Sequence, residues 1–203
     1  MKIVGPYVKL VQVTPNAAEL IELCGRLCYK SEDAITEGSA VSFIAMLKRR
    51  GHLSVLEHAV ASFIIGTDRG VTHELVRHRL ASYSQTSTRY CNYSKDKFDG
   101  EISVVRPVDI MVDTRADDIW LGCCEEAERS YLQLLAQGAS PQTARSVLPT
   151  CLFTEIAMTA NFREWAHFIE LRTSAAAHPD MRRVANLIQR ELVRVAPGIF
   201  DVK

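Results

Sequence analysis

Residues 77–90 read RHRLASYSQTSTRY. The run Arg-His-Arg opens this stretch, and eight of the nine residues at 82–90 carry a side-chain hydroxyl or amide. The exception, Arg89, has a guanidinium whose five N–H donors can hold a phosphate in bidentate fashion. Glu74 and Asp96 are the nearby acids, too few to neutralise three arginines locally. The stretch is typical of a site that donates hydrogen bonds to an anion, and a phosphorylated nucleotide fits it.

On its N-terminal side this stretch continues a helical pattern. The segment VTHELVRHRLA predicts a helix near 70–81, followed by a loop. On such a helix Glu74, Arg77 and His78 would share one face. The apolar positions that could point to the core are Leu75, Val76 and Leu80. The alternative is an amphipathic helix and a polar loop whose arginines pair with surface acids.

Helical and strand-like stretches alternate along the rest of the chain. Other helices are predicted near 16–29, 38–50, 113–137, 140–149, 161–172 and 181–196. Strand-like runs lie near 2–13, 59–66, 102–106 and 151–161, and Gly66 is expected to close the second of them. The mixture predicts an α+β fold, with α/β as the alternative. We expect a single domain over residues 1–203, with a central mixed or antiparallel sheet flanked by helices and a helix-rich C-terminal half.

Composition limits the class of partner. The chain has 203 residues, 47% of them hydrophobic, which suits one domain with a substantial core. Lys plus Arg and Asp plus Glu are equal at 24 each, so no global positive field would gather nucleic acid or an anionic membrane. No apolar run approaches the length of about 18 residues that spans a bilayer, and the N-terminal segment lacks a signal-peptide pattern. We expect a soluble, cytoplasmic protein that binds neither nucleic acid nor a membrane.

The six cysteines are scattered and do not resemble a disulfide framework, so reduced thiols are expected. Cys24 and Cys28 lie four residues apart in a helical pattern, as two zinc ligands could. No paired His or Cys follows at ligand spacing, and thiols inside a helix usually belong to the core. The sequence therefore predicts no metal site.

The motif around residues 77–90 resembles the hallmark of the flavin-dependent thymidylate synthases. In that family Arg-His-Arg is followed by seven residues and a serine, here Arg77-His78-Arg79, residues 80–86 and Ser87, and then by Arg89-Tyr90. Three further segments are similar to family motifs: GHLSVLEH at 51–58, ARSVLP at 144–149 and ELR at 170–172. The resemblance spans about residues 50–185.

This resemblance implies a homotetramer whose active sites lie between subunits and bind FAD, dUMP and 5,10-methylenetetrahydrofolate, with NADPH reducing the flavin. The implied FAD contacts are Ser54, Arg77, His78, Arg79, Gln85, Asn161, Arg163 and His167. The implied dUMP contacts are Glu74, Arg77, Gln85, Ser87, Arg89, Arg145 and Arg172. His52 and Glu57 are further candidates around the flavin.

The chemistry of these side chains agrees with the implied roles. Ser87, Arg89 and Arg145 could supply charge-assisted hydrogen bonds to a nucleotide phosphate. Arg172, the implied catalytic residue, would stabilise the N3-deprotonated, electron-rich uracil ring, because an adjacent cation favours the anionic form. None of the six cysteines follows a proline, the context of the nucleophile in the other thymidylate synthase family. We therefore expect reduced FAD to carry the redox chemistry, with Cys91 the one thiol worth testing.

Three positions depart from the family pattern. Glu74 stands where many members have Gln and Gln85 where many have Glu, which is interpreted as an exchange that keeps one carboxylate and one amide in a pocket. His167 replaces a common Asn, and it could contact the flavin or only pack on a helix face. For Asn161 the alternative role is a helix cap, and for Arg145 and Arg172 it is a surface ion pair.

Two other functions remain open at the level of sequence. A non-catalytic RNA- or nucleotide-binding module could use the arginines together with tyrosines 83, 90 and 93 for stacking, although zero net charge argues against it. Folate- and FAD-dependent methylation of tRNA would be expected to show the Gly-rich dinucleotide fingerprint, which this sequence lacks.

Overall fold

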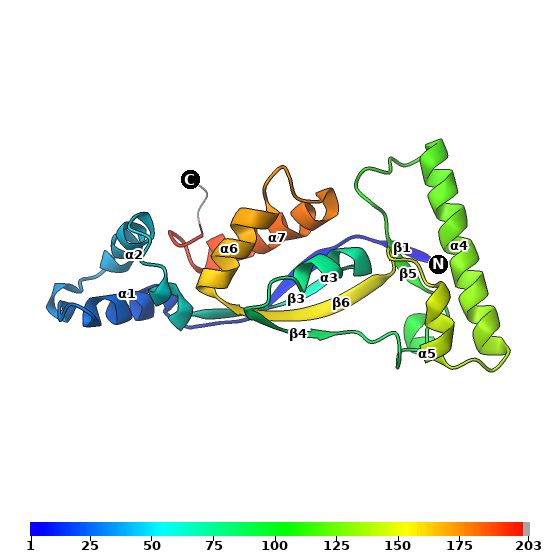
Figure 1. The fold of residues 1–203 in the computed structure, drawn as a ribbon, viewed down its shortest axis with the longest axis horizontal. Helices are drawn as coiled ribbons and strands as arrows, with labels where there is room; N and C mark the ends of the chain where they lie inside the picture. Colours follow the sequence, from blue (N-terminus) through cyan, green and yellow to red (C-terminus); the bar gives the residue numbers. More distant parts are fainter. Residues whose placement is uncertain (201–203) are drawn as a thin grey trace. The chain divides into compact units, whose positions relative to one another are not determined.

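The computed structural model describes residues 1–200 and confirms the α+β class (Figure 1). The strands are β1 (Lys2–Val4), β2 (Tyr7–Val13), β3 (Val60–Asp68), β4 (Ala81–Gln85), β5 (Ser103–Val105) and β6 (Phe153–Asn161). The helices are α1 (Ala17–Leu27), α2 (Ser39–Arg49), α3 (Arg69–Leu75), α4 (Arg115–Ala136), α5 (Pro141–Ala144), α6 (Phe162–Arg172) and α7 (Pro179–Val195). Within the described chain, none of these helices combines the length and apolar character needed to cross a membrane.

The larger sheet has the strand order β2-β3-β6-β4. The N–H of Thr14, just after β2, donates to the carbonyl of Val60 at the start of β3 at 2.9 Å. At the other end of the pair, the ring of Tyr7 lies against Gly66. The start of one strand therefore meets the end of the other, and β2 and β3 run antiparallel.

Strands β3 and β6 are also antiparallel. The hydroxyls of Ser62 and Thr159 are 2.8 Å apart, and the N–H of Arg69, just after β3, donates to the carbonyl of Leu152, just before β6, at 3.1 Å. A second sheet pairs β1 with β5 in parallel. In the larger, central sheet the β2–β3 and β3–β6 pairs are antiparallel, which agrees with the antiparallel form of the prediction, whereas the parallel β1–β5 pair is a separate two-stranded sheet.

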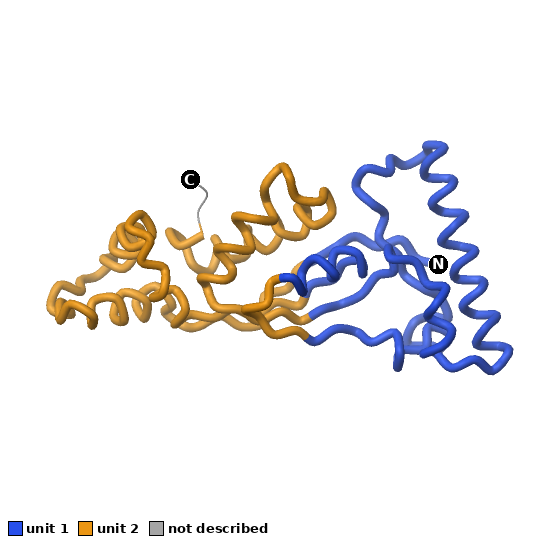
Figure 2. The backbone as a smooth tube through the Cα atoms, viewed as in Figure 1, with its two compact units in different colours: residues 1–7, 65–77, 84–156 blue, residues 8–64, 78–83, 157–203 orange. Residues whose placement is uncertain are grey.

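The chain folds into two compact units (Figure 2). Unit 1 comprises residues 1–7, 65–77 and 84–156, and unit 2 comprises residues 8–64, 78–83 and the segment that starts at 157. Strands β3 and β6 each contribute residues to both units, which agrees with the expected single domain. That this domain takes in all of residues 1–203 stays a prediction.

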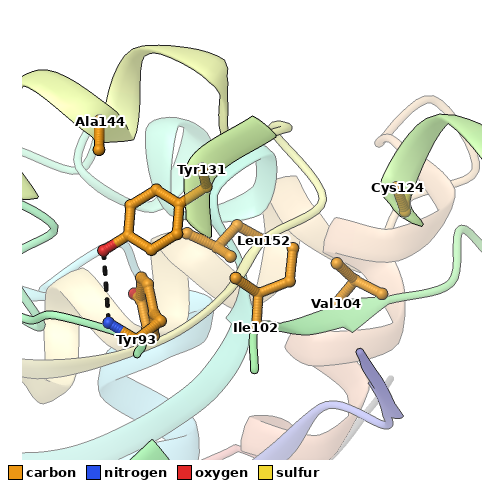
Figure 3. Close-up of a cluster of buried hydrophobic side chains, with 7 residues drawn as sticks. All are labelled: Tyr93, Ile102, Val104, Cys124, Tyr131, Ala144 and Leu152. Atoms are coloured by element: carbon orange, nitrogen blue, oxygen red, sulfur yellow. Dashed lines mark hydrogen bonds between the residues drawn. The ribbon is translucent and has the colours of Figure 1, made fainter. Parts of the chain in front are cut away.

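The core of unit 1 forms where α4 meets β5 and the segment that leads into β6 (Figure 3). Ile102, Val104 and Leu152 are fully buried beside the ring of Tyr131. The Tyr131 hydroxyl accepts the backbone N–H of Tyr93 at 3.3 Å, so the one polar atom of that ring has a partner.

In unit 2 an aromatic cluster fixes α6 on the sheet. Phe63 of β3 meets Trp165 of α6 edge-on, with ring centroids 5.2 Å apart, and Trp165 meets Phe168 in the same way at 5.5 Å. The indole N–H of Trp165 donates to the carbonyl of Ala61 at 3.0 Å. Burial of these rings stabilises the packing of α6 on the sheet, on the order of 1.5–3 kcal/mol for each large side chain.

The helix predicted near 70–81 is shorter than expected, and this corrects the sequence interpretation. Helix α3 begins where the Asp68 side chain accepts the N–H of Val71, and it ends at Leu75. Val76 and Leu80, expected to reach the core, are 41% and 74% exposed. The expected shared face of residues 74, 77 and 78 therefore does not exist.

The loop predicted after that helix is in part a strand. Residues 81–85 form β4 at the edge of the larger sheet, and their burial alternates between half-buried and exposed. This alternation is the two-residue period of a strand with one face covered. In β4 the backbone groups form hydrogen bonds with β6, which is distant in the sequence, so the local residue pattern does not reveal this pairing.

Two smaller boundaries also differ. The strand predicted over 2–13 is split into β1 and β2 around Pro6, which lacks the N–H that a continuous ladder needs. Gly66 lies inside β3 and does not end it. A Cβ at this position would come within 2.2 Å of the ring of Tyr7. The glycine is required there for close packing.

Candidate functional site

His78 lies at the centre of a hydrogen-bonded cluster in unit 2. Its Nδ1 is 2.9 Å from Oε1 of Glu164, and Nε of Arg172 donates to its Nε2 at 3.1 Å. Its backbone carbonyl accepts from the hydroxyl of Tyr83 at 2.8 Å. The side chains of His78 and Glu164 are only 3% and 7% exposed. The predicted catalytic cation, Arg172, is thus tied to a buried imidazole.

The surroundings set the protonation of this cluster. Burial is the main influence on the pKa of His78 and lowers it from 6.5, and the charge of Arg172 lowers it further, whereas the hydrogen bond to Glu164 opposes both. His78 is therefore neutral at pH 7. Burial raises the pKa of Tyr83 to about 12, so its hydroxyl keeps its proton and donates it to the His78 carbonyl.

Helix α6 supplies two members of the cluster. Asn161 caps the helix by accepting the N–H of Glu164 at 2.9 Å, so the alternative structural role considered for Asn161 is realised. Glu164, Phe168 and Arg172 follow at intervals of four residues and line one stripe of the helix. Phe168 meets the ring of His78 edge-on at 5.0 Å. The stripe therefore presents an acid, an aromatic ring and a guanidinium to the same histidine.

Three predicted flavin neighbours meet at a second place in unit 2. His52, Ser54 and Arg163 line a surface cavity of about 370 Å³, whose other walls come from residues 25, 28, 29, 47, 51, 53 and 55. Arg163 forms an ion pair with Glu57 at 2.6 Å across two exposed side chains. This pair is weak in water and available for exchange with a ligand anion.

The remaining flavin candidates of unit 2 flank His78. Arg79 is exposed on the segment between α3 and β4. His167 is exposed on α6, and its ring centroid is 5.7 Å from that of His78. His167 therefore neighbours the buried cluster without belonging to its hydrogen-bonded chain.

In unit 1, Gln85 is oriented from two sides. Its Nε2 donates to Oγ1 of Thr72 on α3 at 3.0 Å and to Oγ1 of Thr154 on β6 at 3.3 Å. Glu74, the other member of the proposed exchange, is half-buried on α3. Whether Glu74 and Gln85 share a ligand pocket stays a prediction.

The predicted phosphate contacts gather at one turn of unit 1. The hydroxyl of Ser87 accepts the backbone N–H of Arg89 at 3.2 Å, which shapes the turn. The guanidinium of Arg145 donates to the hydroxyl of Thr88 at 3.4 Å, although the two residues are 57 positions apart. The structure thus brings the Arg145 side chain to the turn that carries Ser87 and Arg89, and their shared role at a phosphate stays a prediction.

Several of these arginines are exposed cations. Within residues 1–200, no carboxylate forms an ion pair with Arg77, Arg79, Arg89 or Arg145. The surface ion pair considered for Arg145 is therefore not formed in the described chain. Unpaired guanidiniums next to hydroxyl donors suit an anionic ligand such as a nucleotide phosphate.

The cysteines are distributed over both units. All six cysteines are free, and the Cys28 thiol lies 3.7 Å from the carbonyl of Cys24 in the preceding helical turn. In the part of the chain that the structure describes, no cluster of three or more His, Cys, Asp or Glu side chains could hold a metal ion. Cys91 is half-buried, and its N–H donates to the Ser87 carbonyl at 2.9 Å.

The sequence did not point to the side chains that hold these residues. Glu164 stands three residues after Asn161, the spacing of a capping box, which suggests a local role at the helix start. Its carboxylate instead reaches His78, 86 positions away. Thr72, Thr88 and Thr154 were also missed, because their partners come from other segments and leave no local signal.

The comparisons with known proteins place these residues in a family. A family model described as thymidylate synthase complementing protein matches residues 9–198. A flavin-dependent thymidylate synthase of Mycobacterium sp. (strain JLS) is 38% identical over 207 residues, covering 91% of this chain and 79% of its own. The chain belongs to the flavin-dependent thymidylate synthase family. A second family member, from Mycobacterium leprae (strain TN), is 34% identical over 217 residues, 96% of this chain and 83% of its own.

A solved structure has the same fold as this chain. It is a UMP/dUMP methylase from Streptomyces cacaoi bound with 5-Br dUMP, and it superposes with a TM-score of 0.81 at 24% identity. The match covers 98% of this chain and 95% of that chain. At this identity the similarity supports the α+β fold of this chain.

The predicted contacts of this flavin-dependent thymidylate synthase family member divide between the two units. Unit 1 contains Glu74, Arg77, Gln85, Ser87, Arg89 and Arg145. Unit 2 contains His52, Ser54, Glu57, His78, Arg79, Asn161, Arg163, His167 and Arg172. Most implied dUMP contacts thus fall in unit 1 and most implied FAD contacts in unit 2.

Proposed function

We propose that this chain is a thymidylate synthase that converts dUMP to dTMP. In this proposal 5,10-methylenetetrahydrofolate donates the carbon, and FAD reduced by NADPH supplies the hydride. Membership of the family and the name of its curated relatives support the reaction class. The observation that carries the proposal is the turn at 87–89, where the guanidinium of Arg145 reaches the hydroxyl of Thr88 and the exposed Arg89 stands at its position in the family motif.

The proposed dUMP phosphate site is this turn. Arg89 and Arg145 would supply charge-assisted hydrogen bonds, and Ser87 would add its hydroxyl proton, since its oxygen accepts from the backbone. A hydrogen bond to a charged group contributes about 1.5–3 kcal/mol. Two or three such bonds are enough to fix the register of a small nucleotide. Arg77, Gln85 and Glu74 are assigned to the rest of dUMP, on the family resemblance.

Arg172 is the proposed catalytic residue. We assign its guanidinium to the uracil edge, where a fixed cation favours the N3-deprotonated ring and makes C5 more electron-rich. Its Nε–H donates to His78, so one side of the guanidinium is already anchored in the protein. An anchored cation needs less reorganisation when substrate binds.

The cavity lined by His52, Ser54 and Arg163 is the proposed flavin contact in unit 2. A hydroxyl, an imidazole and a guanidinium form a donor set that fits the anionic diphosphate of FAD. Arg77, Arg79, Asn161 and His167 are further proposed contacts. Both nitrogens of His78 already have partners in the protein, so its contact with FAD would involve its ring face or its backbone. Bound FAD would supply the redox chemistry, with no cysteine nucleophile.

We also propose a cytoplasmic homotetramer with active sites shared between subunits. Exposed apolar side chains on and after α1 support a subunit contact: Leu23 is 48%, Leu27 54% and Tyr29 75% exposed. Large exposed apolar groups of this kind are typical of association surfaces. Size-exclusion chromatography with light scattering tests the subunit number.

The proposed function is tested with the purified protein. We expect a yellow preparation that releases FAD on denaturation and forms dTMP from dUMP when methylenetetrahydrofolate and NADPH are present. A colourless protein with strongly salt-dependent RNA affinity and no dTMP formation would instead identify a nucleic-acid-binding module. Omission of folate and of NADPH, one at a time, provides the controls for the carbon donor and the reductant.

A further inference from the structure

We propose that Glu164 is a positioning residue, which holds His78 in the Nδ1–H tautomer so that its Nε2 fixes the guanidinium of Arg172. The inference rests on the proposed role of Arg172 towards dUMP. It goes beyond the family motifs, because Glu164 belongs to none of the segments that carry the resemblance.

Hydrogen-bond polarity determines the tautomer. A carboxylate has acceptors only, so the ring nitrogen that faces Glu164 at 2.9 Å must donate. The Nε–H of a guanidinium is always a donor, so the ring nitrogen that faces Arg172 at 3.1 Å must accept. One form of the imidazole satisfies both requirements, the neutral ring with its proton on Nδ1.

The other protonation states of His78 would break the hydrogen bonds that link Glu164, His78 and Arg172. With the proton on Nε2, an N–H would face the N–H of Arg172 and a lone pair would face the carboxylate of Glu164. A doubly protonated ring would keep the bond to Glu164 but would again oppose Arg172. Because His78 and Glu164 are buried, water cannot replace the lost partners.

The acceptor is itself rigidly placed. Glu164 occupies the first turn of α6, where Asn161 accepts its N–H, and the neighbouring Trp165 is buried and bonded to the sheet. On the opposite side, Tyr83 holds the backbone of His78 at 2.8 Å. These supports fix the ring relative to α6 before any ligand binds.

The charged and titratable groups that contact His78 come from two elements. They are Glu164, His167 and Arg172 from α6 and Tyr83 from β4. Arg77 and Arg79 are the neighbours of His78 in the sequence, and both are exposed. Among the hydrogen bonds of the ring nitrogens, Glu164 provides the acceptor and Arg172 the donor. Removal of the Glu164 acceptor is thus expected to allow the other tautomer of His78, and with it the loss of the hydrogen bond between Nε2 and Arg172.

A neutron structure of the FAD-loaded protein near pH 7 tests the tautomer directly. The expected result is a deuteron on Nδ1 of His78 and none on Nε2. A deuteron on Nε2, alone or together with one on Nδ1, would overturn the proposal. This measurement needs no variant, so it decides the question even if substitution at Glu164 impairs folding.

Variants test the consequence for Arg172. In Glu164→Ala, crystal structures should show the guanidinium displaced from His78, and the dissociation constant for dUMP should rise about tenfold, as for other groups that orient a binding side chain. Glu164→Gln keeps an acceptor oxygen and should stay within about threefold of wild type. Glu191→Ala, which removes a half-buried carboxylate paired with Arg194 on α7, is the matched control and should change neither quantity.

The outcomes separate this inference from the proposed function. If wild-type protein fails to bind dUMP, the proposed function fails, while the tautomer and the position of Arg172 still decide the inference. If Glu164→Ala leaves Arg172 in place and dUMP affinity unchanged, Glu164 has no positioning role. Equal losses in Glu164→Ala and Glu164→Gln would also contradict the proposal, because the acceptor would then be irrelevant.

Discussion

Substitution of Arg89 by Ala should weaken dUMP binding strongly while leaving the fold intact. Arg89 is exposed, and its guanidinium carbon lies 5.3 Å from the ring centroid of Tyr90. An exposed cation–π contact contributes about 0.5–1 kcal/mol, so the free energy of unfolding should fall by less than about 1 kcal/mol. Loss of one charge-assisted bond to the phosphate costs about 1.5–3 kcal/mol. The dissociation constant should therefore rise roughly 10- to 150-fold.

Calorimetric titration of dUMP into the FAD-loaded protein measures this effect. Arg89→Lys keeps the charge but loses the bidentate geometry, so its affinity should fall between those of wild type and Arg89→Ala. Arg129→Ala is the control, because this exposed arginine of α4 pairs with the exposed Glu126, one turn earlier on the same helix. A dissociation constant for Arg89→Ala within about threefold of wild type would refute the phosphate site at this turn.

Three further results are expected. Because burial lowers the pKa of His78 below 6.5, the unfolded chain takes up this proton first as the pH falls. The free energy of unfolding should therefore decrease below about pH 6.5, by up to about 1.4 kcal/mol per pH unit. In His78→Gln, urea titrations at several pH values should show a weaker dependence of this free energy on pH. An equal pH dependence in wild type and variant would contradict the buried, neutral state of His78. Gly66→Ala should lower the free energy of unfolding by about 1–3 kcal/mol, since the new Cβ would lie 2.2 Å from the ring of Tyr7. An unchanged urea midpoint would contradict this packing. If active sites are shared between subunits, mixing inactive Arg145→Ala and Arg172→Ala tetramers after dissociation should restore dTMP formation, and no recovery would argue for sites within one subunit.

Local pattern predicted much of the fold. The ends of helices α1, α2, α4, α6 and α7 lie within two residues of their predicted positions, because each has a sustained apolar stripe and recognisable ends. The failure around residues 76–85 has a physical cause. Leu75 is buried as predicted, but β4 depends on pairing with a distant strand, and Tyr83 alone among its five residues is of a type enriched in strands.

The candidate site likewise contains residues that the sequence could single out and residues that it could not. The sequence singled out Arg77, Arg79 and Arg89 as candidate anion contacts, because clustered cations without nearby acids are visible in the sequence alone. Their role as ligand contacts stays a prediction. The sequence did not identify Glu164 or Thr154, whose partners lie 86 and 69 positions away along the chain. The buried state of His78 was also invisible, since a histidine between two exposed arginines reads as a surface residue.

Release of tritium from dUMP labelled at C5, under anaerobic conditions, tests the central claim most directly. The proposed chemistry predicts release by the wild-type protein that depends on FAD, methylenetetrahydrofolate and NADPH. It predicts comparable release by Cys91→Ser, since no enzyme thiol takes part. Absence of release under every condition would contradict the assignment as a thymidylate synthase. Loss of release in Cys91→Ser alone, with dUMP and FAD still bound normally, would contradict the cysteine-free mechanism.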